Sequence, residues 1–254
     1  MTKRYLSLFL ALCLVLPLFG CTGYTGFDRA PESVMEEPQA PVEETLPLAD
    51  FLDSVESEQV RIMYERLYAL YDYETFDDRS PIPQRFQSIY PDKFSVGTIQ
   101  SAGCGISSLS MVASYLFDEE ITPDMMLKYD YGDKPATAME AGIRDMQLNC
   151  ESYYGTAALE NLDKALEEGR PVIALHQKGS RFTKAGHFLV MAGKNPDGTY
   201  IVNDPNMENY YNPRLVDGFT NGFSREDVTA GLVGIYVFDR KDTFTDLRET
   251  SLTA

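Results

Sequence analysis

The chain has 254 residues, of which 44% are hydrophobic and 24% charged, an ordinary composition for a globular protein with one sizeable core. Its formal net charge of −17 argues against nucleic acid as a partner, because binding phosphates requires a basic surface. An acidic surface favours solubility and a neutral or basic substrate. The sequence shows neither a glycine-rich phosphate loop nor the spacing of metal ligands, so we expect no cofactor and no metal.

Residues 1–20 are typical of a bacterial export signal. A basic start precedes an apolar run over residues 5–19, which is too short for a membrane-spanning helix. The end of this run, Leu18-Phe19-Gly20-Cys21, resembles a lipobox, which implies cleavage before Cys21 and a lipid on its sulfur and new amino group. Lipid chains anchor a protein by burying CH₂ groups, at roughly 0.8 kcal/mol each. We predict an extracytoplasmic lipoprotein anchored to the cell membrane; the alternative is simple secretion after a different cleavage.

Two segments separate this leader from the main domain. Residues 21–47 are rich in proline, glycine and glutamate without an apolar period, which predicts a flexible acidic tether. Over residues 48–71 apolar residues recur at helical spacing, which predicts one long amphipathic helix or two shorter ones in an arm that spans residues 48–78. We expect the arm to pack on the following domain; the alternative is a helix that docks a partner.

The main domain is predicted over residues 79–240, with a tail at residues 241–254. Most of its helices precede most of its strands, which favours an α+β fold with helices packed on an antiparallel sheet. Helices are predicted over residues 104–118, 122–129, 137–147 and 158–168. Strands are predicted over residues 82–89, 148–153, 171–176, 187–193, 199–204 and 231–238.

Cys104 lies in a Gly-Cys-Gly turn directly before a helical pattern. A helix start collects unpaired N–H groups and the positive end of the helix dipole, and both favour a thiolate. Cys104 is therefore either an activated nucleophile or an ordinary buried cysteine. The other cysteine outside the leader and the lipobox, Cys150, lies in a predicted strand. A disulfide between the two would abolish the nucleophile, so catalysis requires that they stay apart.

A predicted hairpin supplies a base for this thiol. If Gly193 pairs with Gly198 across a four-residue turn, His187 lies directly opposite Asp204 on the same face of the sheet. The carboxylate then holds the imidazole in one tautomer and stabilises its charged form. An imidazolium in turn lowers the pKa of a thiol and later protonates the leaving group.

These residues predict a nucleophile, a base and an orienting group in Cys104, His187 and Asp204. The second histidine of the chain, His176, ends an apolar strand with no carboxylate beside it in the predicted pairing. We interpret His176 as structural.

Several stretches of the sequence, in this order and at this spacing, resemble one peptidase family. They are Phe86-Gln87 with Tyr90-Pro91-Asp92, the run from Gly103 to Val112, Gly169-Arg170-Pro171, Gly186-His187-Phe188 and Asn203-Asp204-Pro205. Together they resemble the peptidase-like branch of cysteine peptidase family thirty-nine, the bacteriocin-processing type, over roughly residues 80–238. The resemblance implies a papain-like fold and attack of a thiol on an amide carbonyl.

The resemblance also implies site roles. Cys104 is the nucleophile, His187 the base and acid, and Asp204 the orienting group. Members of the family use a glutamine upstream of the cysteine to donate to the oxyanion. Gln87 lies in the segment that matches this pattern, and Gln100, four residues before the cysteine, is the alternative.

We therefore expect a membrane-anchored cysteine peptidase or related amide hydrolase that acts on a peptide or a cell-wall amide. The alternative from another class is a catalytically silent papain-like lipoprotein that binds peptide or cell-wall partners. A cell-wall amidase shares the cysteine and histidine, but the Asn203-Asp204-Pro205 element favours the peptidase. Nothing in the sequence resembles the ATP-binding or membrane-spanning parts of bacteriocin exporters, so transport is not implied.

Overall fold

A computed structural model describes residues 48–248, with gaps at residues 73–75, 96 and 133. The predicted signal peptide, the predicted lipidation site at Cys21 and the predicted tether lie outside the described residues. Among the helices that are described, none has the length and hydrophobicity needed to cross a bilayer.

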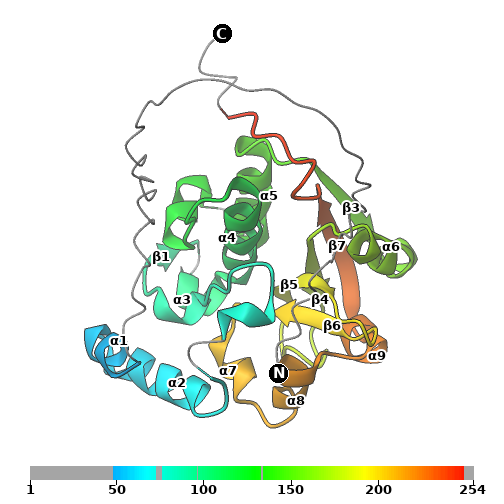
Figure 1. The fold of residues 1–254 in the computed structure, drawn as a ribbon. Coiled ribbons are helices and arrows are strands. Elements are labelled where there is room, and N and C mark those ends of the chain that lie inside the picture. Colours follow the sequence, from blue (N-terminus) through cyan, green and yellow to red (C-terminus); the bar gives the residue numbers. More distant parts are fainter. Residues whose placement is uncertain (1–47, 73–75, 96, 133, 249–254) are drawn as a thin grey trace, which may run out of the picture. The chain divides into compact units, whose positions relative to one another are not determined.

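An antiparallel sheet with strand order β3-β7-β4-β5-β6 forms the centre of the described chain (Figure 1). Its strands are β3 (Cys150–Tyr154), β4 (Val172–His176), β5 (His187–Lys194), β6 (Tyr200–Asn203) and β7 (Leu232–Phe238). A separate ribbon pairs β1 (Lys93–Phe94) with β2 (Gly97–Thr98). The strands predicted after residue 148 are thus confirmed, with ends that differ by one or two residues.

Helices cover both faces of this sheet. They are α1 (Leu48–Ser54), α2 (Glu58–Tyr68), α3 (Ile99–Ala102), α4 (Cys104–Phe117), α5 (Pro135–Asp145), α6 (Thr156–Glu167), α7 (Met207–Tyr210), α8 (Val216–Asn221) and α9 (Arg225–Thr229). Three short 3₁₀ helices are η1 (Asp77–Arg79), η2 (Gln87–Ile89) and η3 (Asp124–Tyr129). The arm therefore contains two shorter helices, and the helix predicted over residues 122–129 is a 3₁₀ helix.

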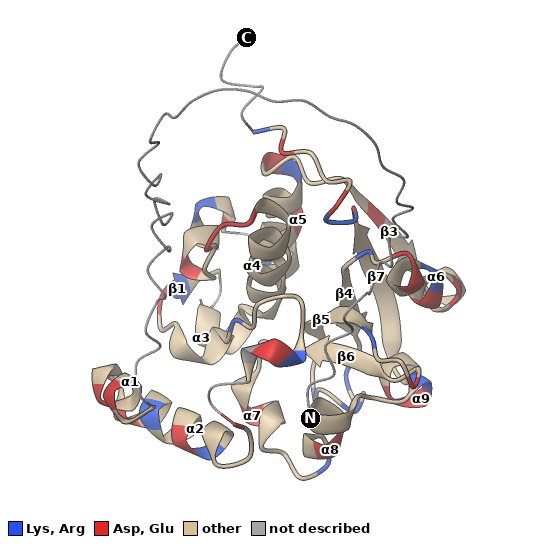
Figure 2. Cartoon of the chain, in the orientation of Figure 1, with Lys and Arg blue, Asp and Glu red and all other residues tan. Residues whose placement is uncertain are grey.

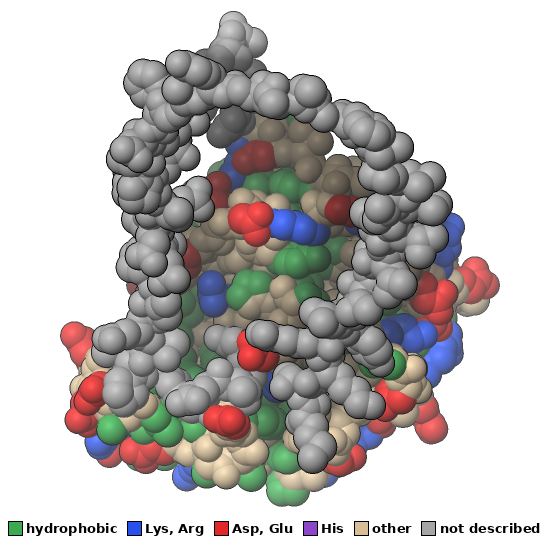
Figure 3. All heavy atoms as spheres, in the orientation of Figure 1, with side chains coloured by type: hydrophobic (Ala, Val, Ile, Leu, Met, Phe, Trp, Pro, Cys, Tyr) green, Lys and Arg blue, Asp and Glu red, His purple; other side chains and the backbone are tan. Residues whose placement is uncertain are grey.

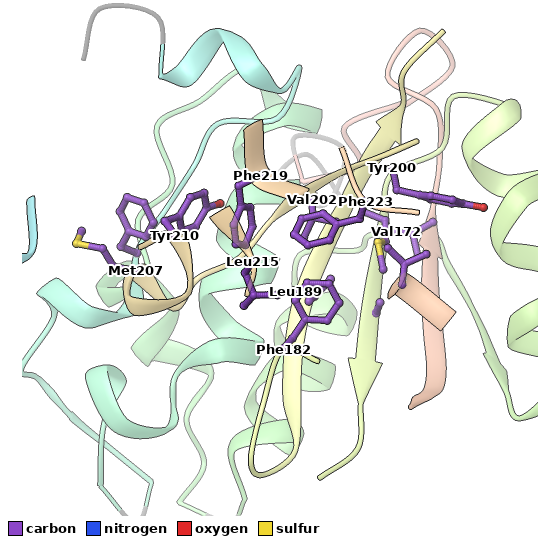
Figure 4. Close-up of a cluster of buried hydrophobic side chains, with 14 of the residues drawn as sticks. Val172, Phe182, Leu189, Tyr200, Val202, Met207, Tyr210, Leu215, Phe219 and Phe223 are labelled. Carbon is purple, nitrogen blue, oxygen red and sulfur yellow. The ribbon is translucent and has the colours of Figure 1, made fainter. Parts of the chain in front are cut away.

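Successive side chains along each strand point to opposite faces of the sheet, which divides the interior into two hydrophobic clusters. On one face, residues such as Ala174, Leu189 and Ile235 pack with α6, α2 and the segment after β6 (Figure 4). On the other face, their neighbours in sequence Ile173 and Val190 pack with α4 and α5. The residues drawn in Figure 4 show how densely aromatic rings from residues 182–223 fill the first cluster.

Helix α4 is held against both the sheet and α5. Nearly all of its side chains are buried, including the four serines at positions 107, 108, 110 and 114. Gly142 on α5 allows the close approach, because a Cβ there would lie 2.6 Å from the Leu109 side chain. This packing places the first turn of α4 beside the start of β5, where Gly105 lies against the ring of Phe188.

The strand predicted over residues 82–89 is wrong. This segment is irregular and ends in η2, since Pro81 and Pro83 remove backbone donors that a ladder needs. Its polar groups bond instead to the end of β6: Asn203 Nδ2 donates to the Ile82 carbonyl at 2.7 Å, and Gln87 N donates to the Pro205 carbonyl at 2.9 Å.

The predicted register of the β5–β6 hairpin is also wrong, by three residues next to the turn and by two residues toward His187 and Asp204. Gly193 pairs with Ile201 rather than with Gly198, and the register shifts again before Val190 pairs with Asn203. The cause lies in the turn, which closes through a bond from Asn195 N to the Thr199 carbonyl at 2.8 Å.

Continuing the pairing of Val190 with Asn203 by one residue puts Asp204 opposite Leu189, two residues from His187. Because side chains alternate with a period of two, an error of two residues leaves His187 and Asp204 on the same face. The predicted contact therefore forms diagonally rather than directly across the pair.

Candidate active site

Cys104 is the first residue of α4, where the chain turns out of the preceding short helix α3. Thr98 caps α3 by accepting a hydrogen bond from Ser101 N at 3.2 Å. Gly103 then makes the turn, because a Cβ there would lie only 2.5 Å from the carbonyl oxygen of Ile99. The sequence Gly-Cys-Gly thus places a half-buried thiol at the start of a long helix. Among the described residues, neither Cys104 nor Cys150 forms a disulfide bond.

His187, the first residue of β5, joins this thiol to Asp204. The residue is 6% exposed, and its Nε2 lies 2.7 Å from Oδ1 of Asp204. The other ring nitrogen, Nδ1, is left for Cys104, whose side chain is hydrogen-bonded to His187. The backbone N–H of Phe188 also donates to the Cys104 sulfur. The three residues predicted from the sequence are therefore linked in the order thiol, imidazole, carboxylate.

The Asp204 carboxylate is fully buried and accepts bonds on both oxygens. Besides His187, Oδ1 accepts from Asn206 N at 2.7 Å, and Oδ2 accepts from Asn209 Nδ2 at 2.7 Å. Asn209 is itself fixed through a bond from Nδ2 to the Phe182 carbonyl at 2.9 Å. Hydrogen bonds of this kind offset the cost of removing a carboxylate from water and prevent it from rotating.

A closed ring of hydrogen bonds holds the backbone of Asp204. Its N–H donates to Tyr210 Oη at 3.0 Å, and that hydroxyl donates to Gln84 Oε1 at 2.6 Å. Gln84 Nε2 completes the ring by donating to the Asp204 carbonyl at 2.8 Å.

Sequence reasoning missed Asn209, Tyr210 and Gln84. The sequence did carry a signal for the bond between Asp204 and Asn206. In the order Asp204-Pro205-Asn206, the Asp side chain commonly accepts a hydrogen bond from the N–H two residues further on. No local pattern marks Gln84, because its partner Tyr210 lies 126 residues away.

Burial and neighbouring charge act in opposite directions on the pKa values of Cys104 and His187. Burial by itself would raise the pKa of Cys104, but the hydrogen bond and positive charge of His187 lower the pKa of that thiol below its usual value. Burial would likewise lower the pKa of His187, but Asp204 and the Cys104 thiolate raise the pKa of the imidazole well above its usual value. The arrangement favours a thiolate beside an imidazolium.

The second histidine lies next to the first. His176 on β4 is the cross-strand partner of His187, is fully buried, and packs against the Phe182 ring at 5.0 Å between centroids. Burial and then the charge of His187 lower the pKa of His176 to about 4. It is therefore an uncharged ring at neutral pH.

The two candidate oxyanion donors are joined through the backbone of Gln100. Gln87 is buried, and its Nε2 donates to the Gln100 backbone carbonyl at 2.9 Å. Its own N–H bonds to Pro205, so Gln87 bridges the segment before Cys104 and the segment after Asp204. The Gln100 side chain is exposed on α3. Across the described residues, no group of three or more His, Cys, Asp or Glu side chains is arranged to hold a metal ion.

Comparison with known proteins places this arrangement in a family. A model of the Peptidase_C39 like family matches residues 79–222, more than half of the chain. A solved structure from Bacillus anthracis, described as a C39-like peptidase, shares 13% sequence identity at a TM-score of 0.38, over 63% of this chain and 95% of that chain. No curated protein matches. The chain belongs to the C39-like peptidase family and has its α+β, papain-like fold.

Proposed function

We propose that this protein is a cysteine peptidase, or a related amide hydrolase, with Cys104 as nucleophile, His187 as base and acid, and Asp204 as orienting group. The observation that carries the proposal is the hydrogen-bonded series from the thiol through the imidazole to the buried carboxylate. A thiolate is the reactive form of cysteine, and a neighbouring imidazolium is a common way to populate it at neutral pH.

The chemistry follows from this arrangement. The Cys104 thiolate attacks the amide carbonyl carbon, and the C=O electron pair moves onto oxygen. When the tetrahedral intermediate collapses, the C–N bond breaks and the His187 imidazolium gives its proton to the leaving amine. Neutral His187 then takes a proton from water, which attacks the thioester, and the C–S bond breaks to release the acid and the thiolate.

Gln87 is the donor that we propose for the oxyanion. One N–H of its amide bonds to the Gln100 carbonyl, which leaves the second N–H for a ligand and fixes the plane of the amide. A preorganised donor of this kind typically contributes about 10² to 10³ in rate.

The rate of alkylation as a function of pH tests the proposal. We expect iodoacetamide to label Cys104 readily at pH 6 to 7 in the full-length protein, with labelling read by mass spectrometry of the peptides. Cys150 is an internal control, since burial raises its pKa to about 12 and it should label slowly.

Hydrolysis is then measured with a library of quenched fluorescent peptides. Labelling at Cys104 that follows an ordinary thiol pKa would contradict an activated nucleophile. A reactive thiol without hydrolysis of any peptide or cell-wall fragment would favour the silent binding protein instead.

Anchoring through a lipid on Cys21 belongs to the same proposal and rests on the lipobox-like sequence alone. It would place the site outside the cytoplasm, against peptide or cell-wall amides. Cells fed an alkyne-tagged fatty acid should incorporate it into the parent protein and not into Cys21→Ala. Equal incorporation into both proteins would refute the anchor.

A further inference from the structure

A pocket lies between the helical arm and the segment that leads to the site. Its volume is about 410 Å³, within the usual range of ligand pockets. Helices α1 and α2 lie close to α3 in Figure 1, on the side of the described chain away from α5. The pocket is lined by Phe51, Val55, Glu56, Ser57, Gln59, Val60 and Tyr64 of the arm, and by Ser88, Ile89, Pro91 and Gln100.

The pocket is lined by residues next to Gln87 in the chain and by Gln100, which Gln87 contacts. Ser88 and Ile89 directly follow Gln87, whose amide bonds to the backbone of Gln100. Gln100 precedes Cys104 by four residues of largely helical chain, which corresponds to roughly 6 Å of rise. An extended peptide advances about 3.3–3.6 Å per residue. A side chain within about three residues of the scissile bond therefore reaches the pocket.

The arm is anchored firmly enough to shape a binding site. The Tyr64 ring meets the Phe86 ring edge-on at 6.2 Å, and Phe86 in turn packs against Tyr210 at 5.4 Å. Tyr210 is the residue whose hydroxyl holds the backbone of Asp204. The arm lies outside residues 79–222, the part of the chain that matches the family. The wall of the pocket that the arm supplies therefore lies outside the part of the chain that matches the family.

The lining indicates what the pocket would bind. Aliphatic and aromatic side chains form most of its wall, and Glu56 is its one charged lining residue. Glu56 is exposed and makes no ion pair with any described residue. The exposed acids Asp50 and Asp53 lie on the adjoining helix α1 (Figure 2). Figure 3 shows acidic and hydrophobic side chains side by side at the corner where α1 and α2 lie. These features favour a bulky apolar group with a cation beside it.

We propose that this pocket is a substrate subsite for a peptide with a bulky apolar side chain followed by a basic residue. The inference rests on the proposed function, because it takes the occupant to be a peptide that lies across Cys104. It adds a specificity determinant, the arm, to a site that the family domain builds.

Binding to the full-length Cys104→Ala protein in detergent tests the subsite without requiring catalysis. The probes are fluorescein-labelled hexapeptides in an alanine-glycine background with a central Phe-Arg, Ala-Arg or Phe-Gln pair, and the readout is fluorescence anisotropy. We expect Phe-Arg to bind about tenfold more tightly than Ala-Arg, and about threefold more tightly than Phe-Gln.

Variants of the lining locate that preference. Gln59→Trp, which fills the pocket from its exposed rim, should remove the advantage of Phe over Ala. Leu70→Trp is the matched control, since Leu70 is 50% exposed and lies outside the pocket. Glu56→Gln should remove the advantage of Arg over Gln and leave that of Phe over Ala.

Equal affinity for Phe-Arg and Ala-Arg, or a preference that survives Gln59→Trp, would overturn the subsite. Circular dichroism of each variant shows whether it has folded. The outcome is separate from that of the proposed function: a catalytically silent protein would still show the preference, and an active peptidase without this subsite would lack it.

Discussion

Cys104 and Cys150 place the same side chain in two different surroundings. Both are half-buried and free, and for both burial is the largest influence on the thiol. At Cys150, on strand β3, Arg170 offsets burial only in part, so the pKa rises to about 12. At Cys104 the bonded and charged His187 outweighs burial, and the pKa falls. The neighbour, more than the degree of burial, decides which cysteine is a nucleophile.

The two histidines repeat the comparison on adjacent strands. His187 and His176 are cross-strand partners, and both are buried. Asp204 bonds to His187 and raises its pKa, whereas His176 has no such bond and its pKa falls to about 4. One carboxylate therefore separates a charged ring from a neutral one beside it.

Removing each cysteine should give the largest contrast. We expect Cys104→Ala to lower kcat/KM on a cleaved fluorogenic peptide by about 10⁴ or more, because the attacking atom is lost. Cys150→Ala should stay within about twofold, since its thiol does not touch the site. A comparable loss of kcat/KM in Cys150→Ala would contradict the assignment of Cys104 alone as the nucleophile.

Removing the charge of Asp204 should have the next largest effect. Asp204→Asn is expected to lower kcat/KM by about 10³, because the amide does not stabilise the imidazolium or fix its tautomer. The pKa for alkylation of Cys104 should rise in the same variant. Asp197→Asn, in the exposed turn between β5 and β6, is the control and should change neither quantity. An unchanged alkylation profile in Asp204→Asn would remove Asp204 from the proposed role.

His176 should make folding stability depend on pH in the acid range. Its pKa of about 4 in the folded protein lies below the 6.5 of an ordinary histidine, so the unfolded chain takes up the proton first as pH falls. The resulting destabilisation is absent above pH 6.5 and reaches about 3 kcal/mol near pH 4.

Urea unfolding of the parent and of His176→Gln at pH 7 and pH 4 measures this difference. The parent should lose about 3 kcal/mol more than the variant between the two pH values. Equal losses would show that His176 is accessible to protons in the folded state.

The two glutamines should give the smallest effect. Gln87→Ala is expected to lower kcat/KM by about 10², and Gln100→Ala by about threefold or less, because the backbone carbonyl of Gln100 is the part that positions Gln87. Alkylation of Cys104 by iodoacetamide forms no oxyanion and should be unchanged in both variants. The reverse order of effects would assign the oxyanion to Gln100.

Local patterns in the sequence were sufficient for most elements. Helix α4, strands β4 to β7 and the positions of Cys104 and His187 at element starts follow from apolar periodicity and from glycine at the ends. The strand predicted at residues 82–89 failed, because its prolines and its long-range bonds to Asn203 and Pro205 outweighed its apolar pattern.

The chain by itself determined which chemical groups exist and on which face of the hairpin they lie. The face on which a side chain lies alternates from residue to residue along a strand, which is a local property. His187 and Asp204 are therefore in contact even though their predicted register was wrong by two residues. Tertiary structure alone decided the ring of Gln84, Tyr210 and Asp204, the contact of Gln87 with Gln100, and the pocket beneath the arm. Each of these joins segments far apart in sequence, and such contacts depend on how whole elements pack rather than on any periodicity within one of them.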